Sequence, residues 1–138
     1  MIDYVRFSED AAHLELAPGF FEAWPQPLSC DQHRAILEKA YLAWLAVDGD
    51  LIIGFITAIS DGIFSAFLPL LEVLPAYRRQ GIGSELVRRM LKSLDHLYMI
   101  DLSCDPELQG FYRRHGLFPS QAMIQRHVHK LEWGPGQQ

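Results

Sequence analysis

The stretch Arg78-Arg79-Gln80-Gly81-Ile82-Gly83-Ser84 decides the fold of this chain. An apolar, strand-like run, residues 64–74, precedes it, and an amphipathic helix is predicted after it because apolar side chains recur on one helical face as far as Leu94. Backbone N–H groups at a helix N-terminus, beside two arginines and two glycines, form a ready site for a phosphate or diphosphate. The sequence therefore predicts a strand, a glycine loop and a helix that bind a phosphate-bearing cofactor.

Two common phosphate-binding patterns do not fit this loop. The Walker pattern requires a lysine after its second glycine, and the dinucleotide pattern requires a third glycine where Leu86 stands. What remains is Arg-x-x-Gly-x-Gly, formed by Arg78, Gly81 and Gly83. This pattern closely resembles the pyrophosphate loop of the GNAT superfamily of N-acetyltransferases.

A second segment, residues 104–118, carries the same resemblance. It is predicted as a short helix with Asp105 as N-cap, Pro106 in the first turn and Gly116 at the left-handed C′ position. Its run Phe111-Tyr112-Arg113-Arg114-His115-Gly116-Leu117-Phe118 resembles the Phe-Tyr-x-x-x-Gly-Phe signature of the superfamily. The family has Asn where Asp105 stands, and because an ionised Asp can only accept hydrogen bonds, we expect Asp105 to cap the helix rather than bind cofactor. The resemblance covers about residues 51–118.

The remaining elements follow from periodicity and turn signals. Helices are predicted from Ser8 to about residue 16 and from Ser29 or Asp31 to residue 39, on either side of a stiff loop. Asp61-Gly62 predicts a hairpin turn. The expected strands span residues 4–7, 41–47, 51–60, 64–74, 97–103 and 123–131.

These elements predict an α/β (α+β) fold with one GNAT-like domain at residues 1–133. Its mixed central sheet has an antiparallel N-terminal meander and a β-α-β crossover, with helices on both faces. The tail, residues 134–138, is expected to be disordered.

Composition limits the class of protein. A chain of 138 residues suits one domain, and its apolar stretches are shorter than the roughly 20 residues that cross a bilayer. The N-terminus does not resemble a signal peptide, so a cytoplasmic location is expected. Cys30 and Cys104 lack metal-ligand spacing and are expected to stay reduced. The net charge of −5, with 17 acidic against 12 Lys and Arg residues, disfavours nucleic-acid partners, charged tRNA included, and suits cationic amines.

The resemblance implies transfer of an acetyl group from acetyl-CoA to a primary amine. It implies that backbone amides of the strand near Leu71 and Val73 bind the acetyl carbonyl. The diphosphate would lie at residues Arg78, Arg79, Gln80, Gly81, Ile82, Gly83 and Ser84. We further hypothesise that the sheet splays beside this strand to admit the pantetheine arm.

Tyr112 and Glu72 are the candidate catalytic residues. In the family the Tyr112 position places a phenol near the cofactor sulfur, where it can protonate the leaving thiolate; the alternative is a ring that only packs under the sheet. Glu72 can accept the amine proton directly or through water; alternatively it is a polar residue on the wetter side of its strand, and a water chain serves as base. Asp61 can attract a cationic amine, but turn formation is the favoured interpretation.

Weaker candidates have simpler explanations. His127 and His129 share one face of a predicted strand, and solvent exposure is favoured over metal binding. His33 is expected on a helix surface. Trp24, with its apolar neighbours Phe20 and Phe21, forms either an acceptor pocket or core.

The predicted function is thus GNAT-type acetylation of a small-molecule or peptide amine, by direct attack in a ternary complex. The alternative is a non-catalytic acyl-CoA-binding or sensing module on the same fold. No metal and no membrane or nucleic-acid partner is expected, and a homodimer is left open. Acceptor identity is not encoded in the matched motifs.

Overall fold

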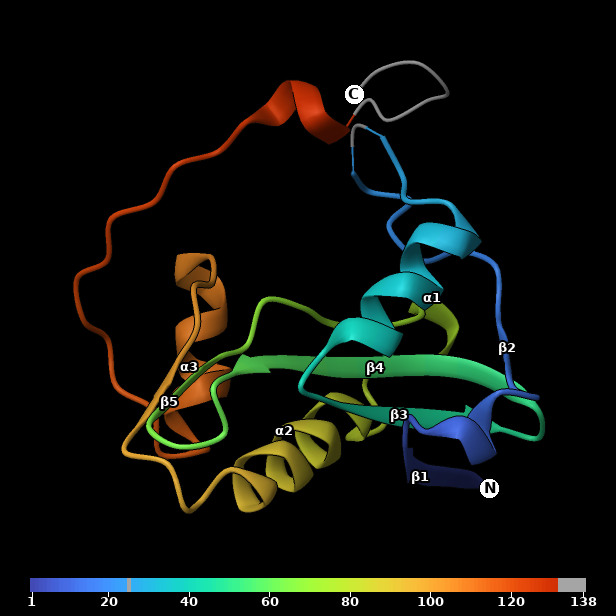
Figure 1. Ribbon diagram of the computed structural model, residues 1–138, viewed down its shortest axis with the longest axis horizontal. Coiled ribbons are helices and arrows are strands. Elements are labelled where there is room, and N and C mark those ends of the chain that lie inside the picture. The colour runs from blue at the N-terminus through green and yellow to red at the C-terminus, as the bar shows by residue number, and fades with distance from the viewer. Residues whose placement is uncertain (25, 132–138) are drawn as a thin grey trace.

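The computed structural model describes residues 1–24 and 26–131, and its sheet is built around one long central strand. The strands are β1 (Ile2–Arg6), β2 (Glu15–Leu16), β3 (Leu42–Asp48), β4 (Leu51–Ser60), β5 (Ser65–Phe67), β6 (Leu71–Val73) and β7 (Met99–Asp101). β4 pairs antiparallel with β3, β5 and β6, and parallel with β2. β1 extends the sheet beyond β3, and β7 extends it beyond β5 as a parallel neighbour. The predicted mixed sheet with its antiparallel meander is confirmed (Figure 1).

Helices cover both faces of this sheet, as predicted. They are α1 (Cys30–Lys39), α2 (Ile82–Ser93) and the short α3 (Gln109–Arg113). α1 and α2 lie on opposite sides of β4 (Figure 1). α2 joins the β5–β6 strand to the parallel β7, which completes the predicted β-α-β crossover. Among the helices of the described chain, none has both the length and the apolar character that crossing a bilayer requires.

Alternating side chains of β4 build two apolar layers. Phe55 points toward α1, where its ring lies 4.4 Å from the His33 ring, centroid to centroid. The next residue, Ile56, is the cross-strand partner of Trp44 on the other face. The Trp44 indole donates to Ser93 Oγ of α2 at 3.1 Å. β4 is thus buried on both faces, which explains its nearly continuous apolar sequence.

Ser29, one of the two predicted starts, is the N-cap of α1. The Ser29 hydroxyl accepts from the Gln32 N–H at 3.1 Å, and the Gln32 side chain accepts from the Ser29 N–H at 2.9 Å. This reciprocal capping box satisfies two N–H groups that the helix itself leaves without partners.

The helix predicted from Ser8 to about residue 16 is wrong. The structure has only a 3-10 turn at Glu9–Ala11, followed by β2. The backbone N–H groups of Glu15 and Ala17 donate to carbonyls of residues 50 and 52 at 3.0 and 3.1 Å. Hydrogen bonds to β4 therefore replace the helical ones, and the local apolar spacing did not reveal that competing partner.

The strand predicted over residues 64–74 is interrupted. β5 and β6 are its two parts, and the pairing register with β4 shifts by one between them, so residues 68–70 lie opposite only residues 57 and 58. The extra residue makes a β-bulge, which bends the strand. Pro69 stands in the middle of the bulge, where its missing N–H removes no ladder bond.

The C-terminal part differs most from expectation. β7 is shorter than the predicted strand 97–103, and the strand predicted over residues 123–131 is wrong. Residues 117–127 run away from the sheet as an extended trace, followed by a 3-10 turn at Val128–Leu131 (Figure 1). Alternating apolar residues make a strand only where a partner edge accepts them. The predicted tail, residues 134–138, lies outside the described residues.

Candidate active site

The sheet opens between β6 and the segment that follows β7. β5 and β7 pair from Ser65 with Met99 to Phe67 with Asp101, and the Leu68 N–H then donates to the Asp101 carbonyl at 2.9 Å. Beyond this bond, β6 pairs with β4 on one side, and no described strand pairs with its other side. The predicted splay beside this strand is therefore present.

Leu71 and Val73 turn their backbone groups toward this opening. The Leu70 carbonyl accepts from the Thr57 N–H at 3.1 Å, and the Leu74 N–H donates to the Ile53 carbonyl at 3.0 Å, so the even-numbered residues of β6 face β4. Because backbone groups alternate along an antiparallel strand, the N–H groups of Leu71 and Val73 point the other way. The edge thus presents two backbone donors at the predicted acetyl position.

The loop after β6 has the backbone that a phosphate cradle requires. Arg79 and Gly81 both adopt left-handed conformations, with φ of 62° and 81°. α2 starts at Ile82, and its N-cap, Gly81, has no side chain to occupy the helix terminus. The first intrahelical bond runs from the Glu85 N–H to the Gly81 carbonyl at 3.0 Å. The amides of residues 82–84 are therefore left without intrahelical partners at the positive end of the helix dipole.

Charge around this loop is net positive. Arg78 and Arg79 are exposed, and the Arg78 Nε also donates to the Val73 carbonyl at 3.0 Å, which ties the loop to β6. Glu85 is held by two hydrogen bonds from Arg88, at 2.6 and 2.9 Å, and by one from Arg89 at 2.8 Å. These arginines, Arg88 foremost, lower the pKa of Glu85 to about 2. Glu85 is therefore ionised, and Arg88 and Arg89 neutralise its negative charge. The positive charges of Arg78 and Arg79 then determine the electrostatic potential at the loop.

Glu72 lies on the opposite face of β6 from Leu71 and Val73. Its half-buried carboxylate accepts from the Phe21 N–H at 3.3 Å. Burial raises the pKa of Glu72, while the Phe21 N–H and then the Arg78 charge act in the opposite direction. A carboxylate whose pKa is raised is a better proton acceptor near neutral pH than an exposed one.

Tyr112 lies on α3 and is half-buried. Burial raises the pKa of its phenol, and the nearby Cys104 adds to the effect. Its ring packs edge-on against Phe111 with centroids 5.0 Å apart. The Phe111 ring in turn lies against the start of α2, because a Cβ built on Gly83 would lie 3.8 Å from Phe111 Cζ. Phe111 thus connects α3 to the glycine loop, and Tyr112 is its neighbour on the same helix.

The ends of α3 agree only partly with prediction. Asp105 stands at the N-cap position of the 3-10 turn Pro106–Leu108, but its side chain makes no capping hydrogen bond, so the predicted capping role is wrong. Gly116 has φ of 89°, as predicted for C′, and the Leu117 N–H reaches back to the Tyr112 carbonyl at 3.3 Å.

Several weaker candidates are resolved by their surroundings. Asp61 is exposed and accepts from the N–H groups of Ile63, Phe64 and Ser65, which confirms its turn role. His33 is only 2% exposed, so the expected surface position is wrong. Its ring fills an aromatic cluster with Phe20, Phe21 and Phe55, and a helical pattern alone did not reveal this burial.

The remaining histidines give no metal site among the described residues. The His127 and His129 rings lie 6.0 Å apart in the C-terminal segment. In residues 1–24 and 26–131, no group of three His, Cys, Asp or Glu side chains is placed to hold a metal ion.

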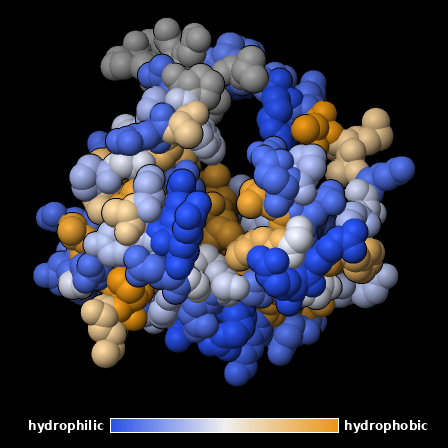
Figure 2. Space-filling view, turned by 180° about the vertical axis from the view of Figure 1, so that it is seen from behind, coloured by the Kyte–Doolittle hydropathy of each residue, from blue (hydrophilic) through white to orange (hydrophobic). Residues whose placement is uncertain are grey.

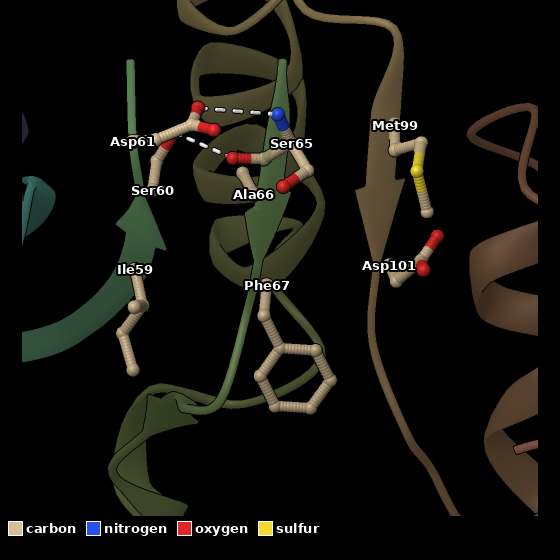
Figure 3. Close-up of a pocket in the computed structure, with 8 residues that line it drawn as sticks. All are labelled: Ile59, Ser60, Asp61, Ser65, Ala66, Phe67, Met99 and Asp101. Carbon is tan, nitrogen blue, oxygen red and sulfur yellow. Dashed lines mark hydrogen bonds between the residues drawn. The ribbon is translucent and has the colours of Figure 1, made fainter. Parts of the chain in front are cut away.

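A groove of about 320 Å³ lies over the closed end of the splay. It is lined by Ile59, Ser60, Asp61, Ser65, Ala66, Phe67, Met99 and Asp101, from β4, β5, β7 and the turn after β4 (Figure 3). None of the residues predicted to bind acetyl-CoA lines it. Figure 2 views the molecule from the side opposite to Figure 1. It shows a hollow near the middle of the view, with hydrophobic residues inside it and hydrophilic residues around it.

Comparison with known proteins agrees with this geometry. The family model described as acetyltransferase (GNAT) family matches residues 10–117. A candidate acetyltransferase from Deinococcus radiodurans R1 is 41% identical, with a TM-score of 0.86, over 97% of this chain and 94% of that chain. A GNAT-family acetyltransferase from Streptococcus pneumoniae TIGR4 is 30% identical, with a TM-score of 0.70, over 92% and 98% of the two chains.

More distant structures share the fold alone. An aminoglycoside acetyltransferase from an uncultured soil sample, solved with sisomicin, is 15% identical with a TM-score of 0.63, over 91% of this chain and 94% of that chain. No curated protein matches the sequence. With the family model covering most of the chain and two structures at 30% identity or more, the chain belongs to the GNAT family of acetyltransferases.

Proposed function

We propose that this protein transfers the acetyl group of acetyl-CoA to a primary amine of a small molecule or peptide. The observation that carries the proposal is a pair of donor groups on either side of the glycine loop in the sequence, one at the open edge of β6 and one at the start of α2. The first group is the outward N–H groups of Leu71 and Val73, and the second is the uncapped amides of residues 82–84. Family membership supports the reaction class, and we assign the thioester to the first donor group and the diphosphate to the second.

The residues present fit the donor group. The amides of residues 82–84, with Arg78, Arg79 and Gln80 beside them, would hold the diphosphate, since the helix terminus is positive and Gly81 leaves it uncovered. The N–H groups of Leu71 and Val73 would bind the pantetheine arm and polarise the acetyl carbonyl. When bound, acetyl-CoA supplies an activated acetyl group as a thioester.

Glu72 would remove a proton from the amine, and Tyr112 would protonate the leaving thiolate. The Glu72 carboxylate accepts the proton of the ammonium group, directly or through water, so that the neutral amine attacks the carbonyl carbon. A C–N bond forms, the nitrogen releases its second proton to solvent water, and the C–S bond breaks. Tyr112 donates its phenolic proton to the sulfur and recovers a proton from solvent. The raised pKa of Tyr112 keeps the phenol protonated before transfer.

Direct attack in a ternary complex needs no acyl-enzyme. Cys30 is exposed at the start of α1, and neither cysteine falls in an acyl-carrier motif. Sequential steady-state kinetics, with intersecting double-reciprocal lines, would support direct transfer, and parallel lines would contradict it.

The acceptor is an amine that is cationic in solution. The formal net charge of −5 favours approach of cations over that of nucleic acid. The decisive test measures free thiol released from acetyl-CoA across a panel of amines that includes polyamines, amino-terminal peptides, sisomicin and a charged tRNA. Thermal unfolding with and without CoA is recorded in parallel. Turnover with an amine supports the proposal; a CoA-induced rise in Tm without turnover on any amine favours an acyl-CoA sensor instead.

A further inference from the structure

A hydrogen bond joins the first turn of α2 to the end of α3. Ser84 Oγ and His115 Nε2 lie 2.8 Å apart in a half-buried position, although the residues are 31 apart in the sequence. Ser84 is the third residue of α2, directly at the uncapped terminus. His115 follows the last residue of α3 by two positions, beyond Tyr112. The bond therefore connects the two halves of the candidate site.

The imidazole of His115 is fixed in place by its neighbours. Its ring packs edge-on against Phe111 with centroids 5.2 Å apart, and Phe111 itself lies against Gly83. Burial lowers the pKa of His115, and the adjacent Arg114 charge acts in the same direction. Both effects favour the neutral ring, in which one of the two nitrogens carries a proton.

The position of that proton decides what the Ser84 hydroxyl can do. A hydroxyl has one proton to donate and two lone pairs to accept with. If His115 Nε2 carries no proton, it accepts a hydrogen bond from the Ser84 hydroxyl, and only the lone pairs of that hydroxyl are left for a ligand. If Nε2 carries the proton, it donates to a Ser84 lone pair and leaves the hydroxyl proton free for a phosphate oxygen.

We propose that His115 is a positioning residue that donates to Ser84 Oγ and so directs the Ser84 hydroxyl proton at the diphosphate of the acyl donor. The inference rests on the proposed function, because it assumes a diphosphate at the start of α2. The negative charge there selects the tautomer with the proton on Nε2, since only that tautomer gives the phosphate a donor rather than a lone pair. His115 acts through Ser84 and does not itself touch the ligand.

Two substitutions separate this role from simple packing. His115→Gln replaces Nε2 with an amide that can donate to Ser84 but removes the aromatic ring. His115→Phe keeps the ring against Phe111 but removes the nitrogen. Ser84→Ala removes the hydroxyl itself, and His96→Ala, at an exposed histidine next to the Gly62 carbonyl, is the matched control.

The experiment measures the Kd of CoA by calorimetry and the Tm of each ligand-free variant. We expect Ser84→Ala and His115→Phe each to weaken CoA binding about five- to tenfold. The double variant should be no weaker than either one, because both remove the same donor. His115→Gln should stay within about twofold of wild type, as should His96→Ala.

Contrary results are distinct. If His115→Phe binds CoA as tightly as wild type, or if the two losses multiply in the double variant, His115 does not position Ser84 and the inference fails. If His115→Phe lowers the Tm, Ser84→Ala still tests the inference. It removes the same hydrogen bond through a small change that leaves the packing of α3 intact. If wild-type protein binds no CoA at all, the proposed function itself fails, and the two failures are told apart.

Discussion

The Glu72 carboxylate accepts a hydrogen bond from the Phe21 N–H at 3.3 Å, across 51 residues of sequence. Phe21 is 1% exposed and has a positive φ of 63°, so this N–H is aimed by a constrained, buried backbone. The strand that carries the proposed acetyl-binding amides is thereby linked to the loop that precedes α1. Glu72 is held in one orientation while its second oxygen remains for a proton.

Replacing Glu72 with Gln tests its role as base. Gln can still accept from the Phe21 N–H but cannot take a proton, so we expect kcat/KM to fall about a hundredfold with the Kd of CoA unchanged. In the wild type, kcat/KM should fall as pH drops through the raised pKa of Glu72, above the ordinary value of 4.5. Glu22→Gln, at an exposed carboxylate, is the control. A Glu72→Gln enzyme with wild-type rates would assign proton removal to water.

The same substitution should change how stability depends on pH. Because the pKa of Glu72 is raised in the folded protein, the native state binds the proton more tightly than the unfolded state. The free energy of unfolding therefore decreases as pH rises through the window above 4.5, and Glu72→Gln removes that decrease. We expect the Tm of the variant, relative to that of wild type, to increase from pH 4 to pH 7 in calorimetry. A Tm difference that does not change with pH would contradict the burial effect.

Replacing Tyr112 with Phe tests the general acid. The ring still packs against Phe111, so folding and the CoA-induced rise in Tm should be retained. Loss of the phenolic proton should lower kcat about a hundredfold or more. Rates are compared with acetyl donors whose thiol leaving groups differ in pKa, because an enzyme without its acid depends more steeply on the leaving group. Unchanged turnover would leave Tyr112 as a packing residue.

The two glycines of the loop should respond in opposite ways to alanine. Gly81 has φ of 81°, so Gly81→Ala should destabilise the protein by about 1–2 kcal/mol although no atom lies within 4 Å of the new Cβ. Gly83 is helical and its Cβ would make ordinary contacts at 3.8 Å, so Gly83→Ala should stabilise by about 0.5–1 kcal/mol. Urea unfolding measures both. Equal effects would mean that space, not backbone conformation, selects the glycines.

Arg79 should contribute to donor binding through charge alone. Its side chain is exposed, so Arg79→Ala should weaken CoA binding about two- to fivefold at low ionic strength. The difference should shrink in high salt because exposed charges are screened. Arg126→Ala, at another exposed arginine in the C-terminal segment, should have no effect. A loss that persists in high salt would point to a structural role of the loop instead.

His33 should make the protein sensitive to acid. Burial, with a smaller effect of Arg34, lowers the pKa of His33 to about 4, and its Nε2 has no partner among the described residues. The unfolded state therefore binds the proton more tightly between about pH 4 and 6.5, and the free energy of unfolding falls as pH drops through that window. His33→Leu should flatten this dependence, whereas His13→Leu, at an exposed histidine, should not.

The glycine loop, α2 and the end of α3 were predictable because their signals are local. Gly81 and Gly116 stand where the backbone turns left-handed, and the apolar stripe of α2 meets the sheet as its spacing predicts. Glu72 lies on a strand and Tyr112 on a helix, as predicted, and their catalytic roles remain predictions. In these segments, backbone conformation is set by residues within one or two turns.

Errors arose where a distant partner decides the outcome. Residues 8–16 do not form the predicted helix, because the end of this segment pairs with β4. Residues 123–131 form no strand in the described structure. Burial of His33 depends on three phenylalanines from other elements, and the bond from His115 to Ser84 crosses between two helices. None of these contacts leaves a trace in local spacing, which is why His115 was not among the predicted site residues.

The bulge at residues 68–70 has a consequence for how quickly the protein can capture its substrate. The bulge bends the strand just after its last hydrogen bond to β7, and no described strand pairs with the outer side of β6, so the opening is present before any donor binds. Binding of the donor then breaks no hydrogen bonds between strands. Diffusional encounter, rather than opening of the sheet, therefore sets the association rate.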